Sequence, residues 1–257
     1  MRAAAEHSAL GEEETSGDPG MTAFSRNVLK MMEKIEYRRC EGGGEDLEDI
    51  FRLRYNSYLS AGMIKSDVSR MVIDAYEDLP TTITYGVYYD GNLVSTVRIQ
   101  HASREDPRCP SLKVFGDIIE PRIAAGESFI DPSRFAADLE WSASLKVLPY
   151  ITLRLPMLAC RYFKTSACLQ AIKGEHAAFY KRVFVAEPLV QGRMYPGLTC
   201  PVDLWQSPSP LVWQQGIRRF AFFRANPMEE RMLFGKRSLE NAPLTILPTA
   251  KYLSYAA

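Results

Sequence analysis

The sequence predicts an α/β sandwich in which helices flank a mixed β-sheet. Two runs rich in β-branched and aromatic residues flank the turn pair Asp90-Gly91, which is typical of an antiparallel hairpin over residues 82–100. Segments with helical apolar spacing lie before and after this hairpin, and short apolar segments alternate with the later ones. Neighbouring antiparallel strands combined with crossover helices are typical of a mixed sheet rather than a doubly wound one.

The region before the hairpin is expected to hold two helices and a strand. Residues 1–20 are small and acidic and are predicted to form a disordered tail. Apolar residues recur with helical spacing over 21–35, and a short strand is expected over 36–40, before three glycines. Asp46 is expected to cap the next helix, whose apolar face also carries Arg54. A buried guanidinium must be paired or face a cleft, so Arg54 requires an explanation.

The region after the hairpin is expected to alternate helices and strands. Pro156 is a candidate for a kink in the second of these helices, and the last helix is amphipathic and rich in arginine. The expected helices cover 113–125, 147–166, 175–183 and 211–234, and the expected strands cover 128–135, 167–173, 188–194 and 199–205.

The composition is that of a soluble globular protein. Of the 257 residues, 46% are hydrophobic and 24% are charged. No apolar run approaches the roughly 20 residues that span a bilayer, and the N terminus does not resemble a signal peptide. The five cysteines form no CxxC pair and the three histidines do not join them at zinc-ligand spacing, so we expect a cytoplasmic protein without a metal. The predicted organisation is a tail over 1–20, one domain over 21–210 and a C-terminal helical extension over 211–257.

Charge is distributed unevenly along the chain. Residues 145–257 carry 15 basic and 6 acidic side chains, although the whole chain sums to zero. An uneven solvated surface is one interpretation, and a docking site for an anionic partner is another. The sequence contains no nucleic-acid-binding motif, so a nucleic acid is not expected. An acidic carrier protein also fits this charge.

Four groups of polar side chains are candidates for a functional site. Taken singly, each is typical of an arginine–acid pair that ties surface elements together. In chain order they are Arg54 with Tyr58, Asp74 with Glu77, Arg98, and the run Asp131-Pro132-Ser133-Arg134-Phe135.

Together, and in this order around the hairpin, the four groups resemble the autoinducer-synthase branch of the GNAT acyltransferase superfamily. This branch includes acyl-homoserine-lactone synthases and N-acyl amino acid synthases, and the resemblance covers roughly residues 45–205. Its most specific part is the acid-x-Ser-Arg-Phe motif at residues 131–135. The resemblance implies a GNAT-like three-layer sandwich with a mixed, mostly antiparallel central sheet flanked by helices, and an acyltransferase activity.

Several features bring the sequence closer to the N-acyl amino acid synthases than to the lactone synthases. Asp131 stands where lactone synthases usually have Glu, and the Trp that usually follows their aromatic at the position of Tyr58 is absent. The segments GEHAAFYKRVF and MYPGL also look more like the N-acyl amino acid synthases. The Gly-rich turn with which CoA-using relatives bind a pyrophosphate is missing after the motif strand. Its absence favours a carrier-protein phosphopantetheine arm, which has one phosphate.

The chemistry of amide formation suggests roles for the motif residues. An ammonium must lose a proton before its nitrogen attacks a thioester, and Asp131 is expected to accept that proton directly or through one water. Arg134, its nearest charged neighbour in the motif, is expected to orient this acid or to hold the substrate carboxylate. Strand-terminal N–H groups are expected to stabilise the oxyanion. His176 or Tyr180, one helical turn apart, is expected to protonate the leaving thiolate, unless both pack against the core.

The acceptor is expected to be an amino acid, whose carboxylate needs a cationic partner when it is buried. Arg54 and Arg98 are the available cations, unless Asp74 or Glu77 neutralises them. The expected substrate-binding residues are Arg54, Tyr58, Asp74, Glu77, Arg98, Ser133 and Phe135.

The first functional interpretation is an N-acyltransferase with no bound cofactor. It would transfer a fatty acyl group from the phosphopantetheine of acyl carrier protein to the amine of an amino acid. A lactone synthase that uses S-adenosylmethionine is the second interpretation, and a catalytically silent module that binds an acylated carrier is the third. The carrier complex is expected to be transient and electrostatic, and a lipid product allows peripheral membrane contact.

Overall fold

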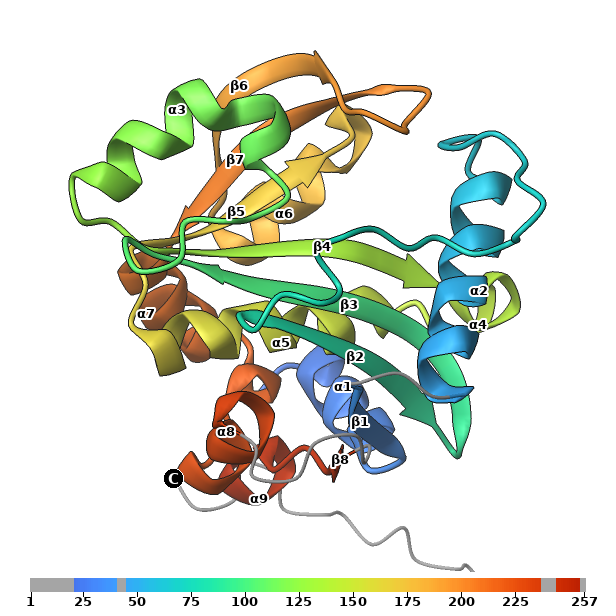
Figure 1. Cartoon of the computed structure of the whole chain (residues 1–257). Coiled ribbons are helices and arrows are strands. Elements are labelled where there is room, and N and C mark those ends of the chain that lie inside the picture. The colour runs from blue at the N-terminus through green and yellow to red at the C-terminus, as the bar shows by residue number, and fades with distance from the viewer. Residues whose placement is uncertain (1–20, 41–44, 237–243, 255–257) are drawn as a thin grey trace, which may run out of the picture.

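A computed structural model describes residues 21–40, 45–236 and 244–254, so the predicted acidic tail lies outside the described residues. Within these residues the strands form one eight-stranded sheet in the order β6-β7-β5-β4-β3-β2-β1-β8 (Figure 1). Every neighbouring pair is antiparallel except β4 with β5, which is parallel. This arrangement confirms the predicted fold class. The strands are β1 Ile35–Cys40, β2 Thr82–Tyr89, β3 Asn92–Ala102, β4 Phe129–Ala137, β5 Ala167–Ile172, β6 Glu187–Met194, β7 Pro201–Pro208 and β8 Leu244–Ile246.

The hairpin of β2 and β3 forms at the predicted turn. Asp90 and Gly91 both have positive φ, at 52° and 80°. A two-residue turn with this backbone matches the right-handed twist of the flanking strands. Glycine adopts it without steric cost, and aspartate adopts it more readily than most other residues. The resulting register places Arg98 opposite Thr84, within the sheet.

Helices cover both faces of the sheet. Val97 and Ile99 of β3 belong to the largest apolar core, against α5. Arg98 lies between them in sequence and therefore faces the other side, which α2 covers (Figure 1). The helices are α1 Ala23–Met32, α2 Glu45–Ser60, α3 Leu112–Ala124, α4 Leu139–Ser144, α5 Leu148–Phe163, α6 Ala177–Phe184, α7 Ser209–Arg219, α8 Pro227–Phe234 and α9 Ala250–Ser254, with 3-10 turns η1 Gly174–His176 and η2 Ala221–Phe223.

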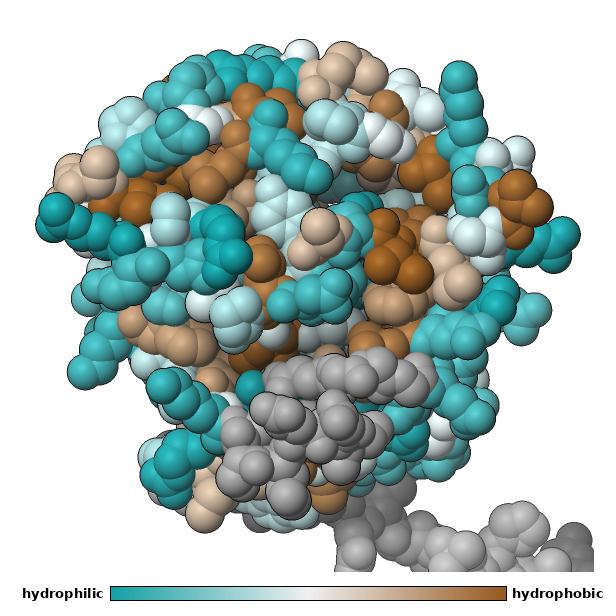
Figure 2. All heavy atoms as spheres, in the orientation of Figure 1, coloured by the Kyte–Doolittle hydropathy of each residue, from teal (hydrophilic) through white to brown (hydrophobic). Residues whose placement is uncertain are grey.

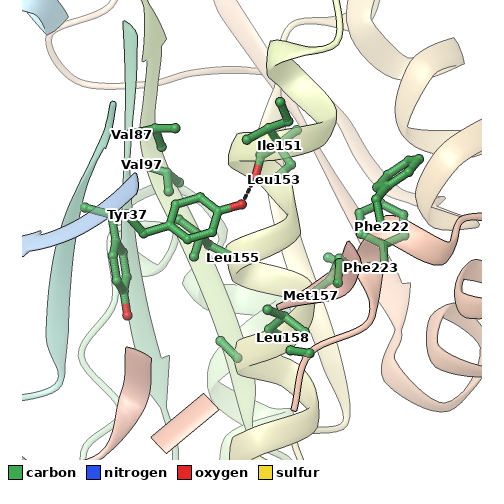
Figure 3. Packing of buried hydrophobic residues seen from close by; sticks show 14 of the residues in the cluster. Tyr37, Val87, Val97, Ile151, Leu153, Leu155, Met157, Leu158, Phe222 and Phe223 are labelled. Atoms are coloured by element: carbon green, nitrogen blue, oxygen red, sulfur yellow. Dashed lines mark hydrogen bonds between the residues drawn. The ribbon is translucent and has the colours of Figure 1, made fainter. Parts of the chain in front are cut away.

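The core around α5 joins both ends of the described chain to the sheet. The Tyr37 hydroxyl of β1 donates to the backbone oxygen of Ile151 in α5 at 2.9 Å (Figure 3). Burial raises the pKa of Tyr37 to about 12, so the phenol stays a donor at neutral pH. Phe222 and Phe223 of η2 pack into the same core. Each fully buried aromatic or aliphatic side chain contributes about 1.5–3 kcal/mol relative to exposure.

The prediction of a single helix over residues 211–234 is wrong, because α7 ends at Arg219 and α8 begins at Pro227. Pro227 has no N–H and occupies the first turn of α8, where none is needed. Asn226 caps that helix by accepting from the backbone N–H of Glu229 at 2.8 Å. The intervening turn directs aromatic side chains into the core. In an uninterrupted helix these side chains would not reach the core.

Three short elements were not predicted, namely α4, α9 and β8. Each has six or fewer residues, too few for a periodic pattern. β8 pairs with β1 at the edge of the sheet, so the region from 211 onward contributes a strand as well as helices. The division of the chain at residue 210 stays a proposal.

None of the helices in the described parts of the chain is long and apolar enough to cross a membrane. α2 and α5 have 16 residues each, fewer than the about 20 that a span requires. Hydrophobic and hydrophilic side chains are interspersed over the face of the molecule in Figure 2.

The parallel pair β4–β5 separates after two residue pairs. Phe129 pairs with Ala167 and Ile130 pairs with Cys168. Beyond these pairs β4 remains bound to β3 and β5 remains bound to β7. The two strands thus diverge inside the sheet, and their facing edges are left without ladder partners.

Candidate active site

A cavity of about 480 Å³, here called the main cavity, opens where β4 and β5 diverge. Residues 131–135 of β4 line it, together with residues 171–173 at the end of β5. α5 and α6 contribute Leu153, Phe179 and Tyr180 to its largely apolar wall. Small-molecule sites commonly have volumes of roughly 300–1,000 Å³ and a few polar groups in an apolar wall.

Asp131 supplies a buried acid to this wall. It is 1% exposed, and its two carboxylate oxygens accept from the backbone N–H and the hydroxyl of Ser111, both at 2.8 Å. Burial raises the pKa of Asp131, and the hydrogen bonds from Ser111 oppose this effect. A carboxylate with a raised pKa is a stronger base when ionised. Asp131 is therefore a buried acid in the cavity wall with a raised pKa, and its role as the catalytic base stays a proposal.

β4 bulges within the motif. Ser133 faces Arg98 and Ala136 faces Thr96 on β3, so two residues of β4 oppose one of its partner. Arg134 lies in the bulge with φ of 56°, a left-handed conformation that is uncommon for a non-glycine residue. The bulge removes backbone groups at positions 134 and 135 from the regular ladder, beside the main cavity.

Three arginines and two acids form one ion cluster between α2, β3 and β4. Arg54 donates to Glu77 at 2.6 Å, and Arg98 donates to both Glu77 at 2.7 Å and Asp74 at 2.5 Å. Arg134 donates to Asp74 at 2.5 Å. Burial opposes ionisation of Asp74, but the guanidiniums of Arg98 and Arg134 hold its pKa well below the usual range. The cluster consists of Arg54, Asp74, Glu77, Arg98 and Arg134.

The cluster changes the expectations for Arg54 and Arg98. Both side chains are 0% exposed, and Asp74 and Glu77 neutralise them, which is the alternative left open from the sequence. Arg98 uses its remaining Nε to donate to the Ser133 hydroxyl at 3.0 Å. Every nitrogen of Arg98 is thus occupied within the protein. Arg54 does not line the main cavity.

Arg134 was expected beside Asp131, but its ion pair is with Asp74. Consecutive side chains around the bulge diverge, so closeness in sequence did not place these two charges together. Arg134 lines the main cavity and keeps 20% of its side chain exposed. It is therefore the most accessible guanidinium of the ion cluster.

His176 and Tyr180 both line the main cavity, from η1 and α6. The His176 side chain is 58% exposed and lies 3.8 Å from Glu175. Tyr180 packs in an aromatic group with Phe179 and Phe184. Burial raises the pKa of Tyr180 far above its ordinary value, so its hydroxyl keeps its proton at neutral pH. Tyr58, Ser133 and Phe135 also line the cavity, and their role in substrate binding stays a proposal.

A comparison with protein families identifies the class. The model of the FeeM N-acyl amino acid synthase family matches residues 49–207, more than half of the chain. The chain belongs to this family. It is thus an acyltransferase of the N-acyl amino acid synthase family, as the motif order predicted.

One solved structure supports the fold of this N-acyl amino acid synthase family member. FeeM, an N-acyl amino acid synthase from uncultured soil microbes, aligns with a TM-score of 0.57 and 15% identity, over 70% of this chain and 94% of that chain. At this identity the similarity shows the fold. The acyl-homoserine-lactone synthase LasI aligns with a TM-score of 0.48 and 15% identity, over 81% of this chain and 98% of that one. A search of curated proteins gives no match.

Sequence reasoning missed Ser111 and Tyr195, which also line the main cavity of this family member. Ser111 begins α3 and holds Asp131, and the Tyr195 hydroxyl donates to the backbone oxygen of Pro110 at 2.8 Å. The one available signal was a serine just before a predicted helix. That signal points to helix capping and does not indicate contact with an acid 20 residues further along the chain.

Proposed function

We propose that this protein transfers a fatty acyl group from acyl carrier protein to the α-amine of an amino acid. The observation that carries the proposal is Asp131, a buried acid in the wall of a largely apolar cavity, in a chain of the N-acyl amino acid synthase family. The cavity would hold the acyl chain, because burying each methylene in an apolar site contributes about 0.8 kcal/mol.

Amide formation requires two protons to be moved. Asp131 would accept one from the ammonium, so that the nitrogen lone pair can attack the thioester carbon. The C–N bond forms and the carbonyl oxygen becomes an oxyanion, which the backbone N–H groups at 134 and 135, in the bulge, would stabilise. The C–S bond then breaks and the thiolate leaves with the electron pair.

The thiolate would take its proton from Tyr180 or His176. Both residues line the cavity, and the raised pKa of Tyr180 keeps the proton on its hydroxyl. The second proton of the nitrogen would pass to the group that protonated the thiolate, which restores that group, and Asp131 would return its proton to solvent. No cofactor is needed in this sequence of steps.

The surface beside the cavity supports a carrier protein as donor. Lys181 and Arg182 are exposed on α6, and Arg218 and Arg219 are exposed on α7. Arg219 donates to the backbone oxygen of Arg182 at 3.2 Å, so these cations form one basic patch. α6 also lines the cavity, so an acidic carrier docked on the basic patch would have its phosphopantetheine arm within reach of the cavity.

The test is an acylation assay with the purified full chain, long-chain acyl carrier protein or acyl-CoA, and amino acids. We expect an N-acyl amino acid by mass spectrometry and faster release of carrier thiol than of CoA. If acyl-CoA is used as fast as acyl carrier protein, the assignment of the carrier protein as donor would be overturned. A lactone from S-adenosylmethionine would overturn the acceptor and favour the second interpretation. A cytoplasmic location and peripheral membrane contact of the lipid product remain parts of this proposal.

A further inference from the structure

A second cavity of about 470 Å³ adjoins the main cavity. It lies between the segment after α2 and the turn that joins β6 to β7, and Arg134 and Leu198 line both cavities. Apolar side chains such as Ile64 and Met71 share its wall with polar ones such as Lys65. The two cavities therefore share Arg134 and Leu198 in their walls.

Hydrogen bonds hold the two sides of the second cavity in place. The backbone N–H of Thr199 donates to the oxygen of Met63 at 2.9 Å, and the Thr199 hydroxyl donates to the oxygen of Gly62 at 2.5 Å. On the α2 side, the backbone N–H of Asp67 donates to the Tyr55 hydroxyl at 3.2 Å. The space is thus framed by segments that are bonded to each other and to α2.

The ion cluster has one more cation than anion. It holds the guanidiniums of Arg54, Arg98 and Arg134 but only the carboxylates of Asp74 and Glu77. Arg98 is fully occupied, whereas Arg54 and Arg134 each keep a buried Nε without a hydrogen-bond partner among the described residues, as does Nη2 of Arg54. A buried unpaired donor of a charged group is costly. Arg54 is 0% exposed and lines neither cavity, whereas Arg134 is 20% exposed and lines both, so Arg134 is the member that a further anion can reach.

We propose that Arg134 binds the carboxylate of an α-amino acid acceptor and that the second cavity takes the acceptor's side chain. The α-amine, one carbon from the carboxylate, would then point into the main cavity, whose wall holds Asp131. This assignment rests on the proposed acyl transfer. It adds the cationic residue and the cavity that would recognise the acceptor. Of the three arginines named from the sequence as possible carboxylate ligands, it selects Arg134 over Arg54 and Arg98. The size of the second cavity leads us to expect that a large side chain is preferred over glycine.

The first test compares leucine with isopentylamine, which is leucine without its carboxylate, using acyl carrier protein as donor. A lost charged hydrogen bond should raise the KM by about 10- to 100-fold, so leucine should be favoured by that factor. In Arg134→Gln the KM for leucine should rise toward that for the amine, so the ratio of the two KM values should fall toward one. Arg134→Lys should restore part of the preference. A merely structural role of Arg134 would impair both substrates equally.

The second test leaves the ion cluster intact. Ile64→Trp narrows the second cavity without touching the main one, so it should reduce the preference for leucine over glycine and leave the KM for the acyl carrier unchanged. Arg108→Gln, an exposed arginine outside both cavities, is the control. Equal use of leucine and isopentylamine by the unaltered protein would overturn this inference while acyl transfer stands. Absence of amide from every acceptor would instead overturn the proposed function, and this inference with it.

Discussion

Asp131 has a geometry that makes its role separable from its contribution to the fold. Asn has the same shape, and its amide oxygen can accept from the Ser111 N–H while its NH₂ donates to the Ser111 hydroxyl. Asp131→Asn should therefore keep its melting temperature but lose about 10²- to 10⁴-fold in kcat, the usual contribution of a general base. Steady-state kinetics and a melting curve check this. Near-normal turnover would remove Asp131 from the role of base.

Ser111 should tune the pH dependence of the reaction. Its hydrogen bonds favour the ionised form of Asp131, against the burial that raises the pKa of this acid. Ser111→Ala removes the hydroxyl and keeps the backbone N–H, so the pKa of Asp131 should rise further. The base must be ionised to accept a proton, so the acid limb of the kcat/KM profile should move to higher pH. An unchanged acid limb would show that another group titrates there.

At the scale of elements, Asp74 links β3 to the bulge of β4. Its folded-state pKa is depressed, so the stability it contributes is present above its unfolded pKa of about 3.9 and is lost as pH falls below that value. Asp74→Asn leaves Arg98 and Arg134 without a full counter-charge and should lower the free energy of unfolding by about 3–5 kcal/mol at pH 7. Urea titrations at pH 7 and pH 3 test this. The difference between variant and parent should shrink at pH 3.

A second buried ion pair links α8 to α5. Arg154 and Glu229 are both 0% exposed and lie 2.5 Å apart, and Arg154 also donates to the backbone oxygen of Phe222 at 2.7 Å. Arg154→Met leaves the Glu229 carboxylate buried without its counter-charge and should lower the free energy of unfolding by about 3–5 kcal/mol. The double variant Arg154→Met with Glu229→Gln should recover part of that loss. Urea unfolding gives both values.

The exposed helix pair of Arg52 with Glu48 is the matched control for this comparison. Arg52→Ala should lower the free energy of unfolding by no more than about 0.5 kcal/mol, because solvent screens the exposed ion pair. Equal losses of unfolding free energy in the Arg154 and Arg52 variants would contradict the stabilising role of the buried ion pair.

For the whole molecule, the charge asymmetry predicts how a carrier protein approaches. Arg218→Glu with Arg219→Glu should weaken carrier binding, and more so at low salt, where surface charges are least screened. Arg224 lies beyond α7 and donates to the backbone oxygen of Leu253 at 3.4 Å, so it is left unchanged. Carrier affinity is measured against ionic strength.

Arg104→Glu with Arg108→Glu is the control of equal charge, since both arginines are exposed in the segment after β3. Equal losses from the two double variants would indicate a general effect of net charge. They would count against the basic patch as a docking site.

Local sequence patterns determined the elements and the family of this protein. The turn pair Asp90-Gly91 specifies the hairpin because its backbone requirement is local, and the order of the motifs around it indicated an acyltransferase of this class. Only the tertiary structure decided which charges meet, since β3–β4 register and the bulge brought Arg98 and Arg134 to Asp74. Likewise, long-range packing broke the predicted terminal helix and brought Ser111 to the acid at the cavity. Pairing between distant residues depends on strand register and burial, which no short-range periodicity encodes.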